Sequence, residues 1–117
     1  MKDIKISGIV VKGDQYGRKL GFPTINLDIT PEGLPPGLKS GVYSGTASFV
    51  SRVPLDTYRA GILINPNGKV EAHLIGYDGD AYGKEVNLNL KKFLRDFKKF
   101  DTEKELIAQI QKDIEMC

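Results

Sequence analysis

The sequence predicts a mainly β domain of six strands followed by a C-terminal α-helix. In the first three-quarters of the chain, short runs alternate apolar and polar residues, and glycine, proline and asparagine separate these runs. In the last quarter, apolar residues recur at steps of three and four, which is the period of an amphipathic helix. Short strands at regular spacing are typical of a small barrel or sandwich.

Six segments carry the strand pattern. The first runs from residue 4 to Gly13, and the others are expected at residues 24–29, 42–50, 57–64, 70–77 and 84–90. The segments at 14–23 and 30–41 are rich in glycine and proline, which predicts long connections. Asn67-Gly68 predicts a tight hairpin between the fourth and fifth strands, because both residues tolerate positive φ.

The helix is expected to begin at Thr102. Thr102 and Glu105 fit a capping box, in which the threonine oxygen and the glutamate satisfy free backbone N–H groups. An apolar stripe that should lie on the barrel follows, formed by Leu106, Ile107, Ile110 and Ile114. A short helical turn before this helix is predicted from Phe93, Leu94 and Phe97.

Composition limits the chemistry available to the 117 residues, which predict a single domain over 1–117. One Cys and one His exclude a Cys/His zinc site, so any metal must be held by oxygen donors, which suits Mg²⁺. Apolar stretches such as 61–64 are far shorter than the ~20 residues of a membrane span. The start of the chain has no signal-peptide pattern, and a formal charge of +2 does not demand nucleic acid. A cytoplasmic protein is therefore expected.

A glycine-rich segment between the first two strands is the first candidate for binding chemistry. Gly13, Gly17 and Gly21 let the backbone approach a ligand, and Arg18 and Lys19 add positive charge. Such a segment can hold phosphates through its backbone N–H groups. It is not a Walker loop, because Gly-Lys-Ser/Thr is absent and a strand follows. An ordinary glycine-rich β connection is the more frequent structure for such a pattern.

Polar residues on two predicted strands add further candidates. Thr24 and Asn26 lie two apart, so their oxygens share a face and could ligate Mg²⁺; a solvated strand face is the alternative that spacing favours. Glu71 and His73 also share a face, where a carboxylate could act as a general base, although a cross-strand ion pair is common there. His73 alone is more often structural. The basic, aromatic run 91–100 could touch a phosphorylated ligand or RNA, or form a solvated face.

Taken together, these residues resemble riboflavin kinases of the bacterial and eukaryotic type, including the kinase module of bifunctional flavokinase/FAD synthetases. The resemblance runs from Gly8 to Glu115. Its motifs are Gly-Ile-Val-Val-Lys-Gly at 8–13, Gly-Arg-Lys-Leu-Gly-Phe-Pro-Thr-Ile-Asn at 17–26, Pro36, Gly-Val-Tyr at 41–43, Val-Glu-Ala-His-Leu at 70–74, Asp-Ala-Tyr-Gly-Lys at 80–84, Phe-Leu-Arg at 93–95, Lys-Phe at 99–100 and the helix at 106–113.

The resemblance implies a six-stranded antiparallel β-barrel with a C-terminal helix. It also implies transfer of the ATP γ-phosphate to the ribityl 5′-hydroxyl of riboflavin, which gives FMN and ADP with Mg²⁺ or another divalent metal as cofactor. Thr24 and Asn26 would ligate the metal, and Glu71 would be the catalytic base. The nucleotide phosphates would be bound by Gly13, Gly17, Arg18, Lys19, Gly21, Thr24 and Asn26. Tyr82 and Arg95 would bind the flavin, with Arg95 in a flap over it.

Riboflavin or FMN and ATP or ADP are the expected partners, with no nucleic acid, no membrane and a monomeric state. Two alternatives stay open: a non-catalytic flavin- or nucleotide-binding regulatory module, and a small RNA-binding barrel. The first is motivated by the turn at 65–69, which is shorter than is usual in the family. Ile25 stands where the family signature most often has alanine, which should alter core packing. No adenylyltransferase module precedes Met1, so FAD synthesis is not expected.

Overall fold

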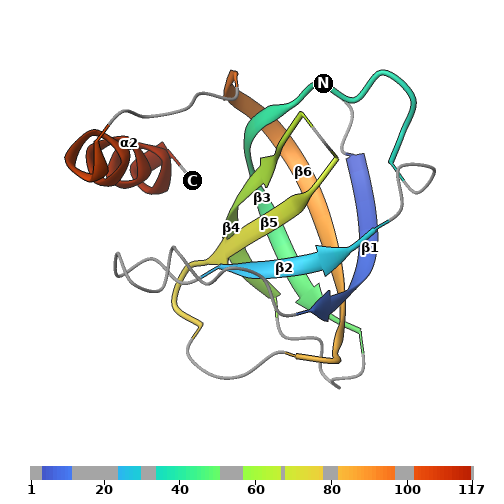
Figure 1. Cartoon of the computed structure of the whole chain (residues 1–117). Helices are drawn as coiled ribbons and strands as arrows, with labels where there is room; N and C mark the ends of the chain where they lie inside the picture. Colours follow the sequence, from blue (N-terminus) through green and yellow to red (C-terminus); the bar gives the residue numbers. More distant parts are fainter. Residues whose placement is uncertain are drawn as a thin grey trace.

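The six strands of the described residues close into one antiparallel barrel (Figure 1). The structure is a computed structural model, and it describes residues 4–11, 24–29, 34–50, 57–66, 68–77, 82–96 and 102–116. The strands are β1 (Ile4–Val11), β2 (Ile25–Asp28), β3 (Gly41–Phe49), β4 (Thr57–Ile64), β5 (Val70–Leu74) and β6 (Glu85–Asp96). Around the barrel their order is β1-β2-β5-β4-β3-β6. The six-stranded barrel with a C-terminal helix is therefore confirmed.

Alternate residues of each strand fill the inside of the barrel. β5 shows this most clearly, because Val70, Ala72 and Leu74 are buried while Glu71 and His73 are only half-buried. Burial of one large apolar side chain contributes roughly 1.5–3 kcal/mol, so this core is the main stabilising element of the barrel. The largest fully buried side chains are Phe49, Ile6, Ile62, Leu88, Leu90, Val10, Val70 and Val86.

β6 is longer than the sequence predicted. The predicted strand ended at residue 90 and a helical turn was expected from Phe93 and Leu94, but β6 continues to Asp96, so that turn prediction is wrong. Phe97, the third residue of the predicted turn, lies outside the described residues. β6 pairs with β3 along its whole length, and the register shifts twice on the way. Such bulges interrupt the alternation of side chains, so the apolar residues in this part of β6 have the spacing expected of a helix. The hydrogen bonds to β3 nevertheless keep the segment in the sheet.

The hairpin between β4 and β5 is closed by Asn65 and Lys69. The backbone N–H of Asn65 donates to the carbonyl of Lys69 at 2.9 Å, and the N–H of Lys69 donates to the side-chain Oδ1 of Asn65 at 2.9 Å. The N–H of Gly68 donates to the carbonyl of Asn65 at 3.0 Å, with φ of 86° at Gly68. A glycine in the left-handed region is the usual end of a three-residue hairpin loop. β5 then ends at Leu74 instead of Tyr77, because the Tyr77 N–H closes a turn onto the Leu74 carbonyl at 3.3 Å.

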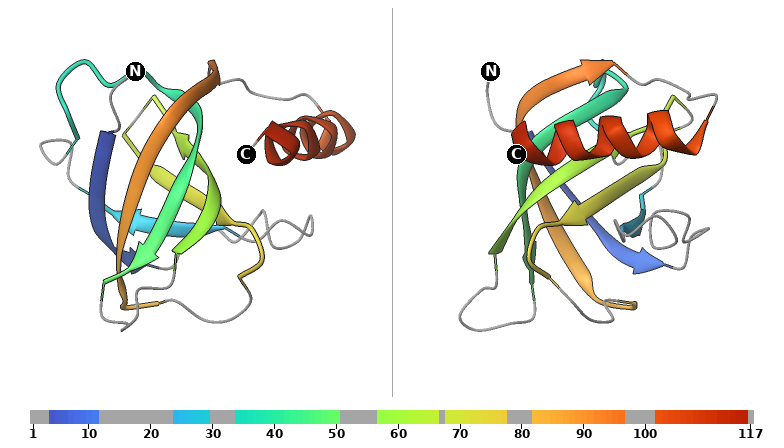
Figure 2. Two further views of the ribbon diagram at one scale, coloured as in Figure 1. Left: turned by 180° about the vertical axis from the view of Figure 1, so that it is seen from behind. Right: turned by 90° about the vertical axis from the view of Figure 1, so that its left-hand side faces the viewer.

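The helix α2 (Glu103–Met116) lies outside the barrel, against β4 (Figure 2). The predicted cap is present, because Thr102 Oγ1 accepts a hydrogen bond from the Glu105 N–H at 3.2 Å. Ile114 of the predicted apolar stripe is half-buried, while the side chains of the other three members lie outside the described part of the chain. No helix within the described ranges is long and apolar enough to cross a membrane.

Tyr43 closes one end of the barrel. Its hydroxyl donates to the Lys39 carbonyl at 2.6 Å, and its ring meets Phe93 edge-on with centroids 5.2 Å apart. Lys39 Nζ lies 4.7 Å from the Phe93 centroid and 3.0 Å from the Asp96 carboxylate. Lys39, Tyr43 and Phe93 border an apolar groove of about 300 Å³. Burial raises the pKa of the Tyr43 hydroxyl above its ordinary value of 10.0.

Replacement of this tyrosine tests how burial and hydrogen bonding contribute. Tyr43→Phe is expected to lower the free energy of unfolding at pH 7 by about 1 kcal/mol, because the hydrogen bond to Lys39 is lost. Above pH ~10 the phenol ionises more readily in the unfolded chain than in the native protein, so the wild type loses stability as the pH rises towards the raised native pKa. The variant lacks this loss. Denaturant titrations measure the free energy of unfolding of both proteins at pH 7 and pH ~10.5. The advantage of the wild type over Tyr43→Phe should be smaller at the higher pH. An equal difference in unfolding free energy at the two pH values contradicts the prediction.

Candidate active site

Residues predicted to act in catalysis and metal binding meet in one row around the outside of the barrel. Directly opposed residues of an antiparallel pair share a face of the sheet, and the five strand pairings can be followed from one end of the row to the other. Across the six strands the row reads Val11, Asn26, Glu71, Leu63, Val42 and Arg95. The barrel register therefore fixes which predicted residues are neighbours.

Asn26 and Glu71 are direct neighbours in this row. β2 and β5 pair with Asn26 opposite Glu71, and both side chains are half-buried. The Cβ atoms of such a pair are roughly 4.5–5.5 Å apart. Leu27 and Val70, the next residues on each strand, point into the core. Buried neighbours on regular strands hold the amide and the carboxylate in fixed positions, which a flexible loop would not do.

Thr24 and His73 extend the same face. The register that aligns Asn26 with Glu71 would, continued by two residues, align Thr24 with His73. On its other side His73 is opposite Gly61 of β4. The prediction that Glu71 and His73 share one face of the strand is confirmed by the burial pattern of β5, which also shows that this face points outwards.

The donors on this face fit a hard divalent cation. Asn26 offers an amide oxygen, Thr24 a hydroxyl and Glu71 a carboxylate. Mg²⁺ prefers such oxygen ligands, and it commonly uses one or two protein groups together with waters and substrate phosphates. Among the residues that the structure describes, no group of three or more His, Cys, Asp or Glu gathers as a metal site. Metal binding by Thr24 and Asn26 remains a prediction. The predicted site is one in which these two protein oxygens and the oxygens of the substrate phosphates together hold the metal.

The described residues that flank the glycine-rich segment lie near this pair. Its predicted phosphate-binding residues Gly13, Gly17, Arg18, Lys19 and Gly21 lie outside the described part of the chain. The flanking residues are described, and Val11 at the end of β1 is opposite Asn26 of β2. Paired strands are about 4.8 Å apart, so Val11, the last described residue before the segment, lies next to the predicted metal ligand Asn26.

Tyr82 lies on the β1 side of Asn26. The Gly83 N–H donates to the Val10 carbonyl at 2.9 Å, which brings the turn that carries Tyr82 alongside the end of β1. Tyr82 is 42% exposed and Val11 is 38% exposed, so an aromatic and an aliphatic side chain remain open to solvent here. Sequence reasoning selected Tyr82 from the family resemblance but missed Val11 and Leu63, the two apolar neighbours of the pair in the row. The sequence shows the alternation of apolar and polar residues on the strands of Val11 and Leu63, but it does not show that these residues are opposite Asn26 and Glu71.

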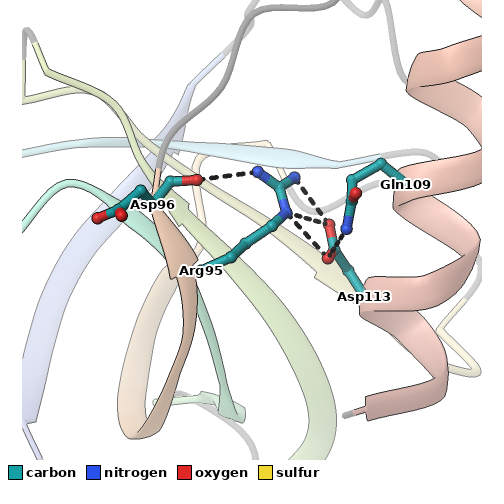
Figure 3. Close-up of polar contacts among 4 residues, drawn as sticks. All are labelled: Arg95, Asp96, Gln109 and Asp113. Atoms are coloured by element: carbon teal, nitrogen blue, oxygen red, sulfur yellow. Dashed lines mark hydrogen bonds and ion pairs between the residues drawn. The ribbon is translucent and has the colours of Figure 1, made fainter.

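Arg95 lies far from Glu71 along the row. In the order β5-β4-β3-β6, three strand-to-strand steps separate the strand of Glu71 from that of Arg95, which is halfway around the barrel. The Arg95 guanidinium is bonded to Asp113 of α2, with Nη2 to Oδ2 at 2.9 Å (Figure 3). The predicted flavin contact of Arg95 stays a prediction, and the structure gives this residue a different partner.

α2 covers the part of the row between these two residues. Val42 is opposite Leu63 and therefore faces outwards, yet it is only 5% exposed. We attribute its burial to α2, which lies against β4 and is bonded to Arg95, the other neighbour of Val42. The Asn26–Glu71 pair thus lies next to the helix-covered part of the barrel, with β4 as the border.

The chain belongs to the riboflavin kinase family, because the family model described as "Flavokinase: Riboflavin kinase" matches residues 1–117. The match covers every element described above and agrees with the resemblance found in the sequence motifs.

Individual relatives agree with this family. The RNA-binding riboflavin kinase RibR of Bacillus subtilis is 35% identical over 113 residues, which cover 93% of this chain and 47% of that protein. The bifunctional riboflavin kinase/FMN adenylyltransferase of Escherichia coli K12 is 34% identical, over 92% of this chain and 35% of that protein. The chain thus spans less than half the length of these relatives. The crystal structure of riboflavin kinase from Trypanosoma brucei has a TM-score of 0.76 at 23% identity, covering 99% of this chain and 75% of that one, which shows the shared fold.

Proposed function

We propose that this domain transfers the γ-phosphate of ATP to the ribityl 5′-hydroxyl of riboflavin and releases FMN and ADP. The observation that carries the proposal is the register of β2 against β5, which sets Asn26 opposite Glu71, with Val11 of β1 on the other side of Asn26. A carboxylate, an amide oxygen and a phosphate-binding backbone are the groups that phosphoryl transfer needs. Membership of the riboflavin kinase family supports the assignment of donor and acceptor.

Glu71 is the proposed catalytic base. Its carboxylate accepts the proton of the 5′-hydroxyl while the hydroxyl oxygen forms a bond to the γ-phosphorus. The bond from the γ-phosphorus to the bridging oxygen breaks, and ADP leaves with that electron pair. A half-buried position on a regular strand suits this role, because it holds the carboxylate in place while leaving it accessible from outside the barrel.

The phosphates and metal are assigned to the β1–β2 side of the base. The Thr24 hydroxyl and the Asn26 amide oxygen hold a divalent metal, Mg²⁺ or a similar ion, which when bound supplies charge neutralisation for the phosphates. The segment between β1 and β2 binds the nucleotide phosphates through backbone N–H groups of Gly13, Gly17 and Gly21 and through the nearby cations Arg18 and Lys19. Tyr82 provides an exposed aromatic surface for the flavin.

The two alternatives from the sequence remain distinct from this proposal. A non-catalytic module would bind flavin or nucleotide without turnover, and the short loop between Asn65 and Lys69 is the feature that motivates it. An RNA-binding barrel is motivated by the basic, aromatic run 91–100, of which Lys91 and Lys92 are exposed on β6, and by the name of the relative RibR. The expected absence of a nucleic-acid partner and the monomeric state remain predictions.

One assay separates the catalytic proposal from both alternatives. Purified protein incubated with riboflavin, ATP and Mg²⁺ is expected to form FMN, and chromatography with flavin fluorescence detects the product. The assay is repeated with Mn²⁺ and Zn²⁺ and with other nucleoside triphosphates. If no combination yields FMN while riboflavin still binds, the protein is a binding module and the kinase proposal is wrong.

Glu71→Gln tests the base. The variant is expected to lower kcat by ~10²-fold or more, because the amide cannot accept the proton of the hydroxyl. The thermal midpoint should change little, since the side chain faces outwards and the amide has nearly the same shape. Glu85→Gln, an exposed carboxylate at the start of β6, is the matched control and should retain wild-type kcat. Wild-type turnover in Glu71→Gln would assign the base to another residue.

Asn26→Ala tests the metal site. The variant is expected to weaken Mg²⁺-dependent ATP binding, so the Mg²⁺ concentration at half-maximal binding should rise by about tenfold. Isothermal titration of ATP at several Mg²⁺ concentrations measures this shift. Asp28→Ala, an exposed residue on the same face of β2, serves as the control. An unchanged Mg²⁺ dependence would remove Asn26 from the site.

A further inference from the structure

Arg95 and Asp113 join the end of β6 to α2 by a two-pronged ion pair (Figure 3). Arg95 Nε donates to both carboxylate oxygens of Asp113, at 3.1 and 3.3 Å, and Nη2 donates to Oδ2 at 2.9 Å. Gln109 Nε2 donates to Oδ1 of the same carboxylate at 3.0 Å. Arg95 Nη1 donates to the carbonyl of Asp96 at 3.1 Å. The planar guanidinium is thus held on two sides, by the strand end and by the helix.

The Asp113 end of the pair is shielded from solvent, while the Arg95 side chain keeps 23% of its surface exposed. Asp113 is 9% exposed and is the one buried charged or polar residue among those that the structure describes. A carboxylate loses hydration when it is buried, so its partners must replace the lost hydrogen bonds. Exposed ion pairs contribute little to stability, whereas removal of one partner from a buried pair is strongly destabilising. Loss of either partner is therefore expected to loosen the attachment of α2 to the end of β6.

The strand that carries Arg95 is itself held tightly. Gly41, the first residue of β3, is opposite Asp96 with φ of 147°, and a Cβ there would collide with the carbonyl oxygen of Arg95. This close approach of two backbones fixes the base of the arginine side chain. The ion pair therefore joins α2 to a strand end that the barrel itself holds in place.

The helix held in this way borders the proposed active site. It covers the row at Val42 and lies against β4, whose Leu63 is the direct neighbour of Glu71. Arg95 is three strand steps from Glu71, but α2 spans part of the distance between them. A change in the position of α2 would alter the wall beside Glu71 while leaving Glu71 and Asn26 in their strands.

We propose that the Arg95–Asp113 ion pair is a positioning latch that fixes α2 as one wall of the riboflavin site. Arg95 acts on substrate binding through the helix, and its guanidinium is engaged by Asp113 instead of the flavin. The proposal rests on the proposed riboflavin kinase function. It replaces the role of flavin ligand that the family resemblance implied for Arg95.

Three variants and a control test the latch: Arg95→Met, which keeps the apolar stem, Asp113→Asn, which keeps the shape, the double variant, and Glu115→Gln, an exposed carboxylate on the same helix. Hydrogen exchange of the α2 amides and riboflavin binding by flavin fluorescence are measured together with KM and kcat. Each single variant is expected to raise the riboflavin KM and the α2 exchange rate by about tenfold, because either one breaks the ion pair that compensates the buried Asp113 carboxylate. The double variant should be no worse than either single variant, and kcat should stay within about twofold.

The outcomes separate the possible roles. If Arg95→Met raises the riboflavin KM while Asp113→Asn does not, Arg95 contacts the flavin directly and the latch is wrong. If both variants loosen α2 but leave riboflavin binding unchanged, the pair serves stability alone and the positioning role is wrong. Failure of the proposed function is recognised separately, because wild-type protein would then form no FMN. In that case the riboflavin-binding and hydrogen-exchange measurements still test whether the ion pair positions α2 for riboflavin binding. If the wild-type protein binds no riboflavin, the latch proposal is wrong as well.

Discussion

Closure of the sheet in a single register is the constraint on which the rest of the structure depends. Each strand offers its alternate residues to the core, and the pairing of six strands into a ring leaves no freedom to slide one strand against its neighbours. A slip of one residue would turn Glu71 inwards and Val70 outwards, at the cost of burying a carboxylate. The burial of Phe49, Ile62 and Leu88 therefore also determines that Asn26 and Glu71 face each other on the outside. The same strand register therefore stabilises the barrel and aligns the residues proposed to act in catalysis.

The parts that were predictable from sequence are those with a local physical signal. Alternation marked the strands and placed Glu71 outside, and the side-chain oxygen of Thr102 marked the start of α2. Pairing of β2 with β5 carries no local signal, so the neighbourhood of Asn26 and Glu71 could only be inferred from the family resemblance. The extension of β6 was missed because two bulges broke its alternation near Phe93.

The contact between Arg95 and Asp113 shows a second kind of information that the sequence does not display. The two residues are 18 positions apart, one on a strand and one on a helix, and neither element has a period that relates them. A sequence motif drew attention to Arg95, but the motif does not tell whether the guanidinium meets a ligand or another part of the chain. Burial of Asp113 supplies the missing information, because a buried carboxylate requires such a partner.

The short hairpin between β4 and β5 has a consequence for how this domain can vary. Asn65 and Lys69 lock the two strands through backbone and side-chain hydrogen bonds, and Glu71 follows only two residues later. Pro66 and Gly68 lie beyond these hydrogen bonds, so a longer loop could be inserted there without changing the register of Glu71. Evolution or design can thus lengthen or shorten the hairpin tip while the Glu71 carboxylate stays in place. Such changes could alter substrate specificity without altering the proton transfer.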